Sequence, residues 1–320
     1  MTSRPPIMLT RFVVVPAGKE FREDLHPRDQ RGRFARRPGG ASAAAMTDKE
    51  FAARQEWVAK TIRQARSSHA TEITHRHDGV WDAERDRAHR EIARDLYAAA
   101  ARVPTEGRAV VAGGLGGAGK TTTLRDHAGI NPDDYFTINP DDIKEELARR
   151  GMIPQVPGHP DLSPMERAAL VHYESGRIAD LVADMAYRDR RNIIWDITMS
   201  SPQVLEDRLV ELRQHGYSEA TAVFVDIPVE TSVARALDRY RRGVDAWHRG
   251  EGLGGRYVPP DVIRGQRGRG GRTINRDTFD QMRDRFARWA VYDNSVHGRP
   301  PQLVEASHNG DTDDDEEEVT

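Results

Sequence analysis

One short segment constrains the fold of this chain more than any other: an apolar run that leads directly into a glycine-rich loop. Ala109–Ala112 has the character of a buried strand, and residues 122–128 beyond the loop are compatible with a helix. Between them, the spacing Gly-x-x-x-x-Gly-Lys-Thr predicts backbone N–H groups that hold the phosphates of a nucleoside triphosphate. Lys120 would neutralise the outer phosphates, and Thr121 would ligate Mg²⁺. The expected nucleotide contacts in this loop are Gly114, Gly116, Gly117, Ala118, Gly119, Lys120, Thr121 and Thr122.

From residue 104 to 304 the chain alternates apolar runs with helical stretches, which is typical of parallel strands joined by crossover helices. We therefore predict an α/β fold, a P-loop NTPase-type parallel sheet flanked by helices. Further strands are expected near 135–138, 192–197 and 220–227, and helices over 144–150, 163–188 and 203–215. Ligands bind at the carboxyl ends of strands in such sheets, so the residues that follow each run are candidates for function.

Acidic residues follow two of these apolar runs. Asp141 and Asp142 come after Pro140, which favours the first turn of a helix and places both acids at the edge of the phosphate site. Stabilisation of the helix end by negative charge is the ordinary role of such residues. Asp196 ends the third apolar run, where a Walker B acid holds Mg²⁺ or its water.

Arginine is concentrated late in the chain. Between Arg235 and Arg272 there are ten arginines against four acids, in a segment that is also rich in glycine. We interpret the region near 241–272 as a lid that closes over the triphosphate and stabilises the charge of the transferring phosphoryl group. For most of these arginines, a basic surface loop is the simpler interpretation.

Composition limits the possible chemistry of the chain and characterises the segments on either side of this domain. Because the 320 residues include no cysteine, disulfides, thiolate metal sites and cysteine nucleophiles are excluded. No apolar run is long enough for a membrane helix, so we expect a soluble cytoplasmic protein. The net charge of −3 hides a basic N-terminal arm, 1–46, and an acidic tail, 305–320, both expected to be disordered. Between arm and domain, 47–103 is predicted to be a helical preamble that packs on the core.

Over roughly Asp82–Val304, the chain resembles the zeta toxin family of P-loop kinases in several ordered motifs. They are the helix at 83–92, the P-loop, Asn139–Lys144, Ser163–Ser175, Ile194–Thr198, Asp238–Tyr240 with Arg256, and Tyr292–Ser295. The resemblance implies an ATP-dependent kinase that transfers the γ-phosphoryl group to a sugar hydroxyl of UDP-N-acetylglucosamine.

The resemblance also implies roles for single residues. One aspartate of the Asn139–Lys144 motif acts as general base, and the alignment favours Asp141 over Asp142, which is assigned to substrate binding. Arg239 and Arg256 correspond to the paired lid arginines that would hold the γ-phosphate. Asn294 belongs to the segment near the adenine. The other expected substrate contacts are His172, Glu174 and Thr198.

Two departures from the family lie on the substrate side. Ile197 stands where the family often has glycine, and Ser200 stands where arginine is common. These positions bear on the identity of the sugar nucleotide more than on kinase chemistry. One alternative is a polynucleotide kinase, or another small-molecule P-loop kinase, that uses the arginine-rich segment and the arm. Another is a phage virion or interaction protein that carries a zeta-like domain.

Expected partners follow from the same resemblance. They are ATP, a nucleotide sugar and a separate antitoxin protein, and we do not expect nucleic acid or a membrane to be a partner. Residues 47–103 immediately precede the P-loop strand, so an alternative is that they restrain the site in cis. Association with a virion is the alternative to a purely cytoplasmic location.

Overall fold

A mostly parallel six-stranded sheet forms the centre of the molecule. The computed structural model describes residues 46–307, so the arm up to residue 45 and the tail beyond residue 307 lie outside the described residues. The strands run in the order β4-β5-β3-β6-β7-β8, and only β8 is antiparallel to its neighbour. Their bounds are β3 Ala109–Gly113, β4 Phe136–Ile138, β5 Ile193–Asp196, β6 Ala220–Asp226, β7 Arg288–Asp293 and β8 Gln302–Ala306. The predicted α/β fold is confirmed, with the P-loop strand in the interior of the sheet.

Helices cover both faces of this sheet, which explains why β3 is buried throughout and reads as a continuous apolar run. On one face, Trp195 and Phe224 pack in a core with residues of α3 (Ala83–Ala99), α5 (Pro140–Arg149), α6 (His172–Arg188), α7 (Pro202–Gln214) and α10 (Ile274–Met282). On the other face, Val110 and Val223 pack with α4 (Lys120–Asp126), α8 (Val229–His248) and α9 (Pro260–Arg264). Alternate strand residues therefore supply two separate cores.

The segment before β3 is helical, as its periodicity predicts. α1 (Asp48–His69) begins with the capping box of Thr47 and Glu50, and α3 follows after the short α2 (Thr71–Thr74). A two-stranded hairpin of β1 (Arg76–His77) and β2 (Val80–Trp81) lies between α2 and α3 and has no counterpart in the sequence-based expectation. None of the described helices is both long and apolar enough to span a membrane.

One predicted helix is shorter than expected. The stretch 163–188 begins with turns and a 3-10 helix at Ala168–Val171, and α6 begins only at His172. The reason lies in local hydrogen bonds: the Glu166 carboxylate accepts from the backbone N–H and the hydroxyl of Ser163, at 2.8 and 2.9 Å. The turn that this side chain holds replaces the first part of the predicted helix.

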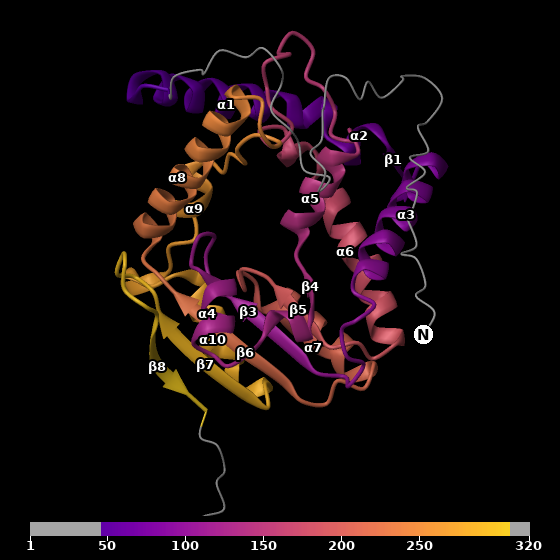
Figure 1. Ribbon diagram of the computed structural model, residues 1–320, viewed down its shortest axis with the longest axis vertical. Helices are drawn as coiled ribbons and strands as arrows, with labels where there is room; N and C mark the ends of the chain where they lie inside the picture. The colour runs from indigo at the N-terminus through magenta and orange to yellow at the C-terminus, as the bar shows by residue number, and fades with distance from the viewer. Residues whose placement is uncertain (1–45, 308–320) are drawn as a thin grey trace, which may run out of the picture.

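The elements stand around the carboxyl ends of the strands in a closed arrangement (Figure 1). The sheet lies at the bottom of the view, α8 and α9 rise on one side, and α5 and α6 rise on the other. Helix α1 crosses above them and joins the two sides. The segments that carry the predicted site residues therefore all face the same region.

Candidate active site

The P-loop backbone adopts conformations that favour glycine at its two ends. Gly114 has φ +126°, and a Cβ there would lie 2.2 Å from the carbonyl oxygen of Val225 on the neighbouring strand β6. Gly119 has φ +86°, and a Cβ there would lie 2.7 Å from the Asn294 side-chain nitrogen. Glycine is therefore favoured at these two positions for two separate reasons: the backbone is left-handed, and neighbouring atoms leave no room for a Cβ.

Replacing Gly114 by alanine is therefore expected to weaken ATP binding about tenfold or more, because the loop must deform to remove the clash and the strained φ. Calorimetric titration with Mg-ATP measures the change in Kd. Gly116→Ala is the matched variant: nothing lies within 4 Å of its Cβ position and its φ is not positive. We expect a clearly smaller loss there, and equal losses in the two variants would contradict this explanation.

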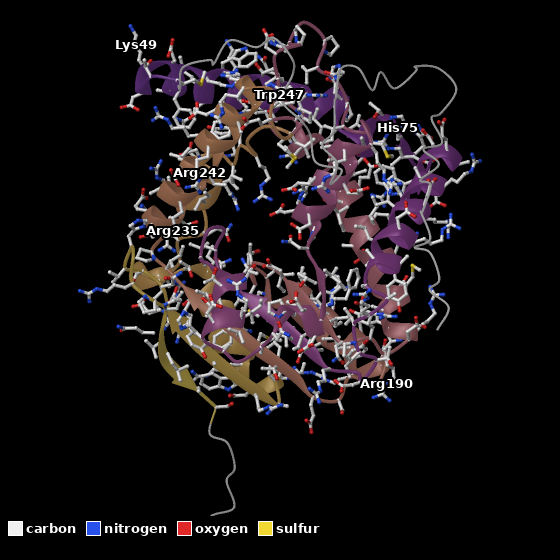
Figure 2. All side chains as sticks on the ribbon, viewed as in Figure 1. Lys49, His75, Arg190, Arg235, Arg242 and Trp247 are labelled. Carbon is white, nitrogen blue, oxygen red and sulfur yellow. The ribbon has the colours of Figure 1, made fainter. Side chains whose placement is uncertain are left out.

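Side chains from α8 and from the end of β7 support the loop from outside. The Arg235 guanidinium donates to the carbonyls of Gly117, at 3.1 Å, and Asn294, at 2.9 Å. The Asn294 amide donates to the carbonyl of Ala118 at 2.7 Å, and the Ser232 hydroxyl donates to that of Gly116 at 2.6 Å. Arg235 lies on the part of α8 nearest the sheet (Figure 2). Ser232 and Arg235 are not among the site residues predicted from the sequence, although they share a face of α8 with Arg239 at helical spacing.

Lys120 and Asp196 meet beneath the loop. The Lys120 ammonium lies 3.2 Å from the Asp196 carboxylate and donates to the Gly114 carbonyl at 3.1 Å. Asp196 sits at the end of β5 in register with Ala112 of β3, which is why two segments 76 residues apart converge here (196 − 120). Asn139 also donates to Asp196, at 3.2 Å.

The beginning of α5 presents two carboxylates with opposite pKa shifts. Burial alone would raise the pKa of Asp141, but the charges of Lys144 and Arg256 outweigh it and lower that pKa to about 2. Lys144 lies 3.0 Å from Asp141, and Arg256 forms an ion pair with its other oxygen. For Asp142, burial raises the pKa to about 6, reinforced by the negative charges of nearby Glu145, Asp196 and Asp141.

The two lid arginines come from different segments, and one of them contacts Asp141. Arg256 pairs with Asp141 directly, while burial and the nearby Arg256 charge lower the pKa of Arg239. Two guanidinium charges that influence each other suit an anion with several oxygens.

Two glycines of the lid region pack tightly. A Cβ on Gly243 would lie 2.5 Å from the Gly255 Cα, and one on Gly255 would lie 2.2 Å from the Tyr240 carbonyl oxygen. Gly243 and Gly255 therefore let the segment that leads to Arg256 lie directly against α8. This close packing places Arg256 beside the arginine-bearing face of that helix.

The predicted substrate residues divide into two groups. His172 and Thr198 are exposed residues. The imidazole of His172 is partly desolvated by its neighbours, which together with the charges of Lys144 and Arg66 lowers its pKa. Glu174 is fully buried and bound by Arg85, at 2.6 and 2.9 Å, and by His89, at 2.8 Å. The expectation that Glu174 contacts substrate is therefore wrong, since its carboxylate joins α6 to α3 inside the core.

The loop that carries Thr198 is held from below. The Thr198 carbonyl accepts a hydrogen bond from the side-chain amide of buried Asn275 on α10 at 2.7 Å. The next residue, Met199, has φ +56°, and its sulfur would lie 2.3 Å from a Cβ on Gly113. A residue other than glycine with positive φ is uncommon, and here the packing against β3 fixes it.

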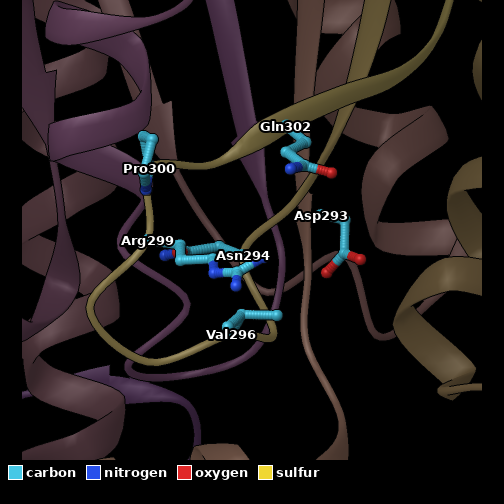
Figure 3. Close-up of a pocket in the computed structure, with 6 residues that line it drawn as sticks. All are labelled: Asp293, Asn294, Val296, Arg299, Pro300 and Gln302. Carbon is cyan, nitrogen blue, oxygen red and sulfur yellow. The ribbon is translucent and has the colours of Figure 1, made fainter.

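A small hollow lies beyond the P-loop support, at the turn between β7 and β8 (Figure 3). It holds about 20 Å³, room for about one water molecule. Its lining residues are Asp293, Asn294, Val296, Arg299, Pro300 and Gln302. The segment expected near the adenine thus contributes its side chains partly to this turn and partly, through Asn294, to the P-loop.

A P-loop between β3 and α4, a strand-end acid on β5 and an arginine-bearing helix after β6 define a P-loop protein of the kinase type. The chain belongs to the zeta toxin family, whose model matches residues 96–296. A comparison with curated proteins finds no match.

Solved structures with a chain of similar fold come from two systems. A complex described as AvrRxo1-ORF1:-ORF2 with ATP has a TM-score of 0.53 and 17% identity, covering 71% of this chain and 68% of the other. The PezAT chromosomal toxin-antitoxin system of Streptococcus pneumoniae has a TM-score of 0.51 and 16% identity, covering 71% and 82%. At such identities the likeness concerns the fold.

Proposed function

We propose that the chain is an ATP-dependent kinase of the zeta toxin type, which transfers the γ-phosphoryl group to a hydroxyl of a nucleotide sugar such as UDP-N-acetylglucosamine. One observation carries this proposal: Asp141, a candidate base, is ion-paired with the lid arginine Arg256 at the edge of the P-loop site. A base, a cation for the moving phosphoryl group and a triphosphate loop are what phosphoryl transfer to an alcohol needs.

The donor half would be formed by the P-loop, with Lys120 on the outer phosphates and Asn294 supporting the loop. Thr121 and Asp196 fit Mg²⁺, because the ion is commonly bound by one or two protein oxygens while phosphate and water complete its shell. The described residues contain no group of three or more acidic or histidine side chains placed to hold a metal. When bound, the ion would neutralise charge on the phosphates.

The acceptor half would be formed by Asp141, Asp142, His172 and Thr198. A triphosphate competes with Asp141 for Arg256, because phosphate oxygens carry more charge than a carboxylate. Binding of ATP would then release Asp141 to accept the hydroxyl proton while Arg239 and Arg256 hold the γ-phosphate. A weak base suffices, since the bond to the incoming oxygen forms late in a loose transition state.

Phosphorus NMR of ATP with a panel of acceptors tests the proposed function. We expect ADP and a new phosphomonoester signal with UDP-N-acetylglucosamine or a related nucleotide sugar, and none with oligonucleotides. Transfer to an oligonucleotide 5′-hydroxyl would point to a polynucleotide kinase instead. Absence of ATP binding would point to an interaction or virion protein.

The opposite pKa shifts of Asp141 and Asp142 predict the pH profile. Asp142 takes up a proton as the pH falls through about 6, whereas Asp141 stays ionised down to about pH 2. We therefore expect kcat/KM to fall below about pH 6, because protonated Asp142 loses its capacity as a charged acceptor for a substrate hydroxyl. Asp142→Asn should lower kcat/KM and remove this limb. A limb that persists in Asp142→Asn would assign it to another group.

We also propose a separate antitoxin protein as partner, since the structural neighbours include a toxin-antitoxin system, and a cytoplasmic location in a bacterial host.

Restraint in cis by 47–103 would need contacts with the nucleotide loop. Within 46–307, the hydrogen bonds and ion pairs of α1 and α3 lead to α8, to 150–174 and to 189–191. None of those bonds reaches residues 114–122, so inhibition by obstruction is not supported.

A further inference from the structure

Helix α1 is attached at its beginning to α8. The Phe51 and Tyr240 rings lie 5.4 Å apart, and Phe51 packs in a small core with Tyr240 and Val244. Arg241 of α8 forms an ion pair with Asp48 at 2.5 Å and donates to the Met46 carbonyl at 2.6 Å. The first half of α1 thus holds the helix that carries Arg239.

The second half of α1 is attached to the opposite side of the molecule. Its buried face packs against the segment that leads into α6; the residues of this core are Val58, Ile62, Ala65, Val156, Leu162 and Leu170. The Thr71 hydroxyl just beyond α1 donates to the Leu170 carbonyl at 3.2 Å. Figure 1 shows α1 lying across both sides.

The two attachments meet at one buried carboxylate, Glu166. Arg54 of α1 binds it with two hydrogen bonds of 2.7 Å, and the Tyr240 hydroxyl of α8 donates to it at 2.7 Å. Glu166 is 2% exposed. A buried carboxylate is stable only while its partners remain, so this node ties three separate segments into one geometry.

The node lies next to both lid arginines. Tyr240 directly follows Arg239, and the Tyr240 carbonyl is the group against which Gly255 packs, one residue before Arg256. We propose that α1 is an activating strap that fixes Arg239 and Arg256 relative to Asp141, with Arg54 as a positioning residue. This inference rests on the proposed kinase function. Restraint in cis would make α1 an inhibitor, whereas a strap makes it an activator, so loosening the strap lowers turnover.

The test compares two buried arginines of the same kind. Arg54→Met removes the strap ion pair, and Arg85→Met removes a similarly buried pair with Glu174, which links α3 to α6 and not to α8. With UDP-N-acetylglucosamine as acceptor, we expect kcat to fall about tenfold or more in Arg54→Met, with the Kd of Mg-ATP within about threefold. Arg85→Met should lose thermal stability to a similar degree without this loss of kcat.

A distance measurement separates this inference from the proposed function. The chain has no cysteine, so spin labels can be placed on exposed positions of α8 and α6 through Ala234→Cys and Asp184→Cys. We expect the distance distribution to broaden in Arg54→Met and to stay narrow in Arg85→Met. That result would support the strap even if the wild type turned over no acceptor.

A milder variant keeps the test usable if Arg54→Met does not fold. Tyr240→Phe removes only the hydroxyl that links α8 to Glu166 and should lower kcat severalfold. Higher turnover in Arg54→Met or in Tyr240→Phe would overturn the proposal and favour inhibition by α1. Distance distributions and kcat values that match those of Arg85→Met would overturn it too.

Discussion

Replacing Asp141 by asparagine is expected to lower kcat about 10²–10⁴-fold, while the Kd of Mg-ATP changes by no more than a few-fold. The substitution keeps the size of the side chain and its place in the first turn of α5, where its backbone N–H donates to Asn139 at 2.9 Å. It removes the charge that accepts the hydroxyl proton. Phosphorus NMR of ATP consumption with a nucleotide sugar measures the loss.

The neighbouring carboxylate provides the control for this prediction. Asp142→Asn removes a carboxylate charge one residue further along the chain. We expect a smaller fall in kcat than in Asp141→Asn, with the loss mainly in KM. Turnover in Asp141→Asn equal to that of the wild type would refute the assignment of the base. A larger loss of kcat in Asp142→Asn would move the base to Asp142, whose pKa of about 6 suits proton transfer near neutral pH.

The fold could be predicted because its signals are local. A strand buried on both faces must be apolar at every position, and a P-loop needs glycine where φ is positive, so β3 and Gly114 are visible in the sequence alone. The parallel sheet follows from the alternation of strands and helices. The β1–β2 hairpin was missed because its two-residue strands carry no periodic pattern.

The site was only partly predictable because several roles depend on contacts between distant segments. Glu174 reads as a polar residue at the start of α6, and only the fold shows that Arg85, 89 residues earlier, binds it in the core. Arg235 is one of ten arginines in its region, and its role at the P-loop depends on where α8 packs. Charge composition alone does not distinguish a surface arginine from one that supports a loop.

Lysine at position 120 is expected to matter for both binding and turnover. Lys120→Ala should weaken Mg-ATP binding and lower kcat about 10²–10³-fold, the scale seen when one preorganised donor to a developing charge is removed. The ammonium already lies among oxygen atoms, 3.2 Å from Asp196 and 3.1 Å from the Gly114 carbonyl, so it needs little rearrangement to meet phosphate oxygens. Calorimetry and phosphorus NMR measure the two effects separately.

The chain offers a closely matched control in Lys144. Both lysine side chains are 12% exposed, and each is paired with an aspartate, at 3.2 Å for Lys120 and 3.0 Å for Lys144. Each alanine variant loses one positive charge and one ion pair with an aspartate, but Lys120 belongs to the P-loop whereas Lys144 lies on α5 beside Asp141. Lys144→Ala should leave the Kd of Mg-ATP within a few-fold. Equal weakening in both variants would show that general charge, and not the P-loop position of Lys120, governs triphosphate binding.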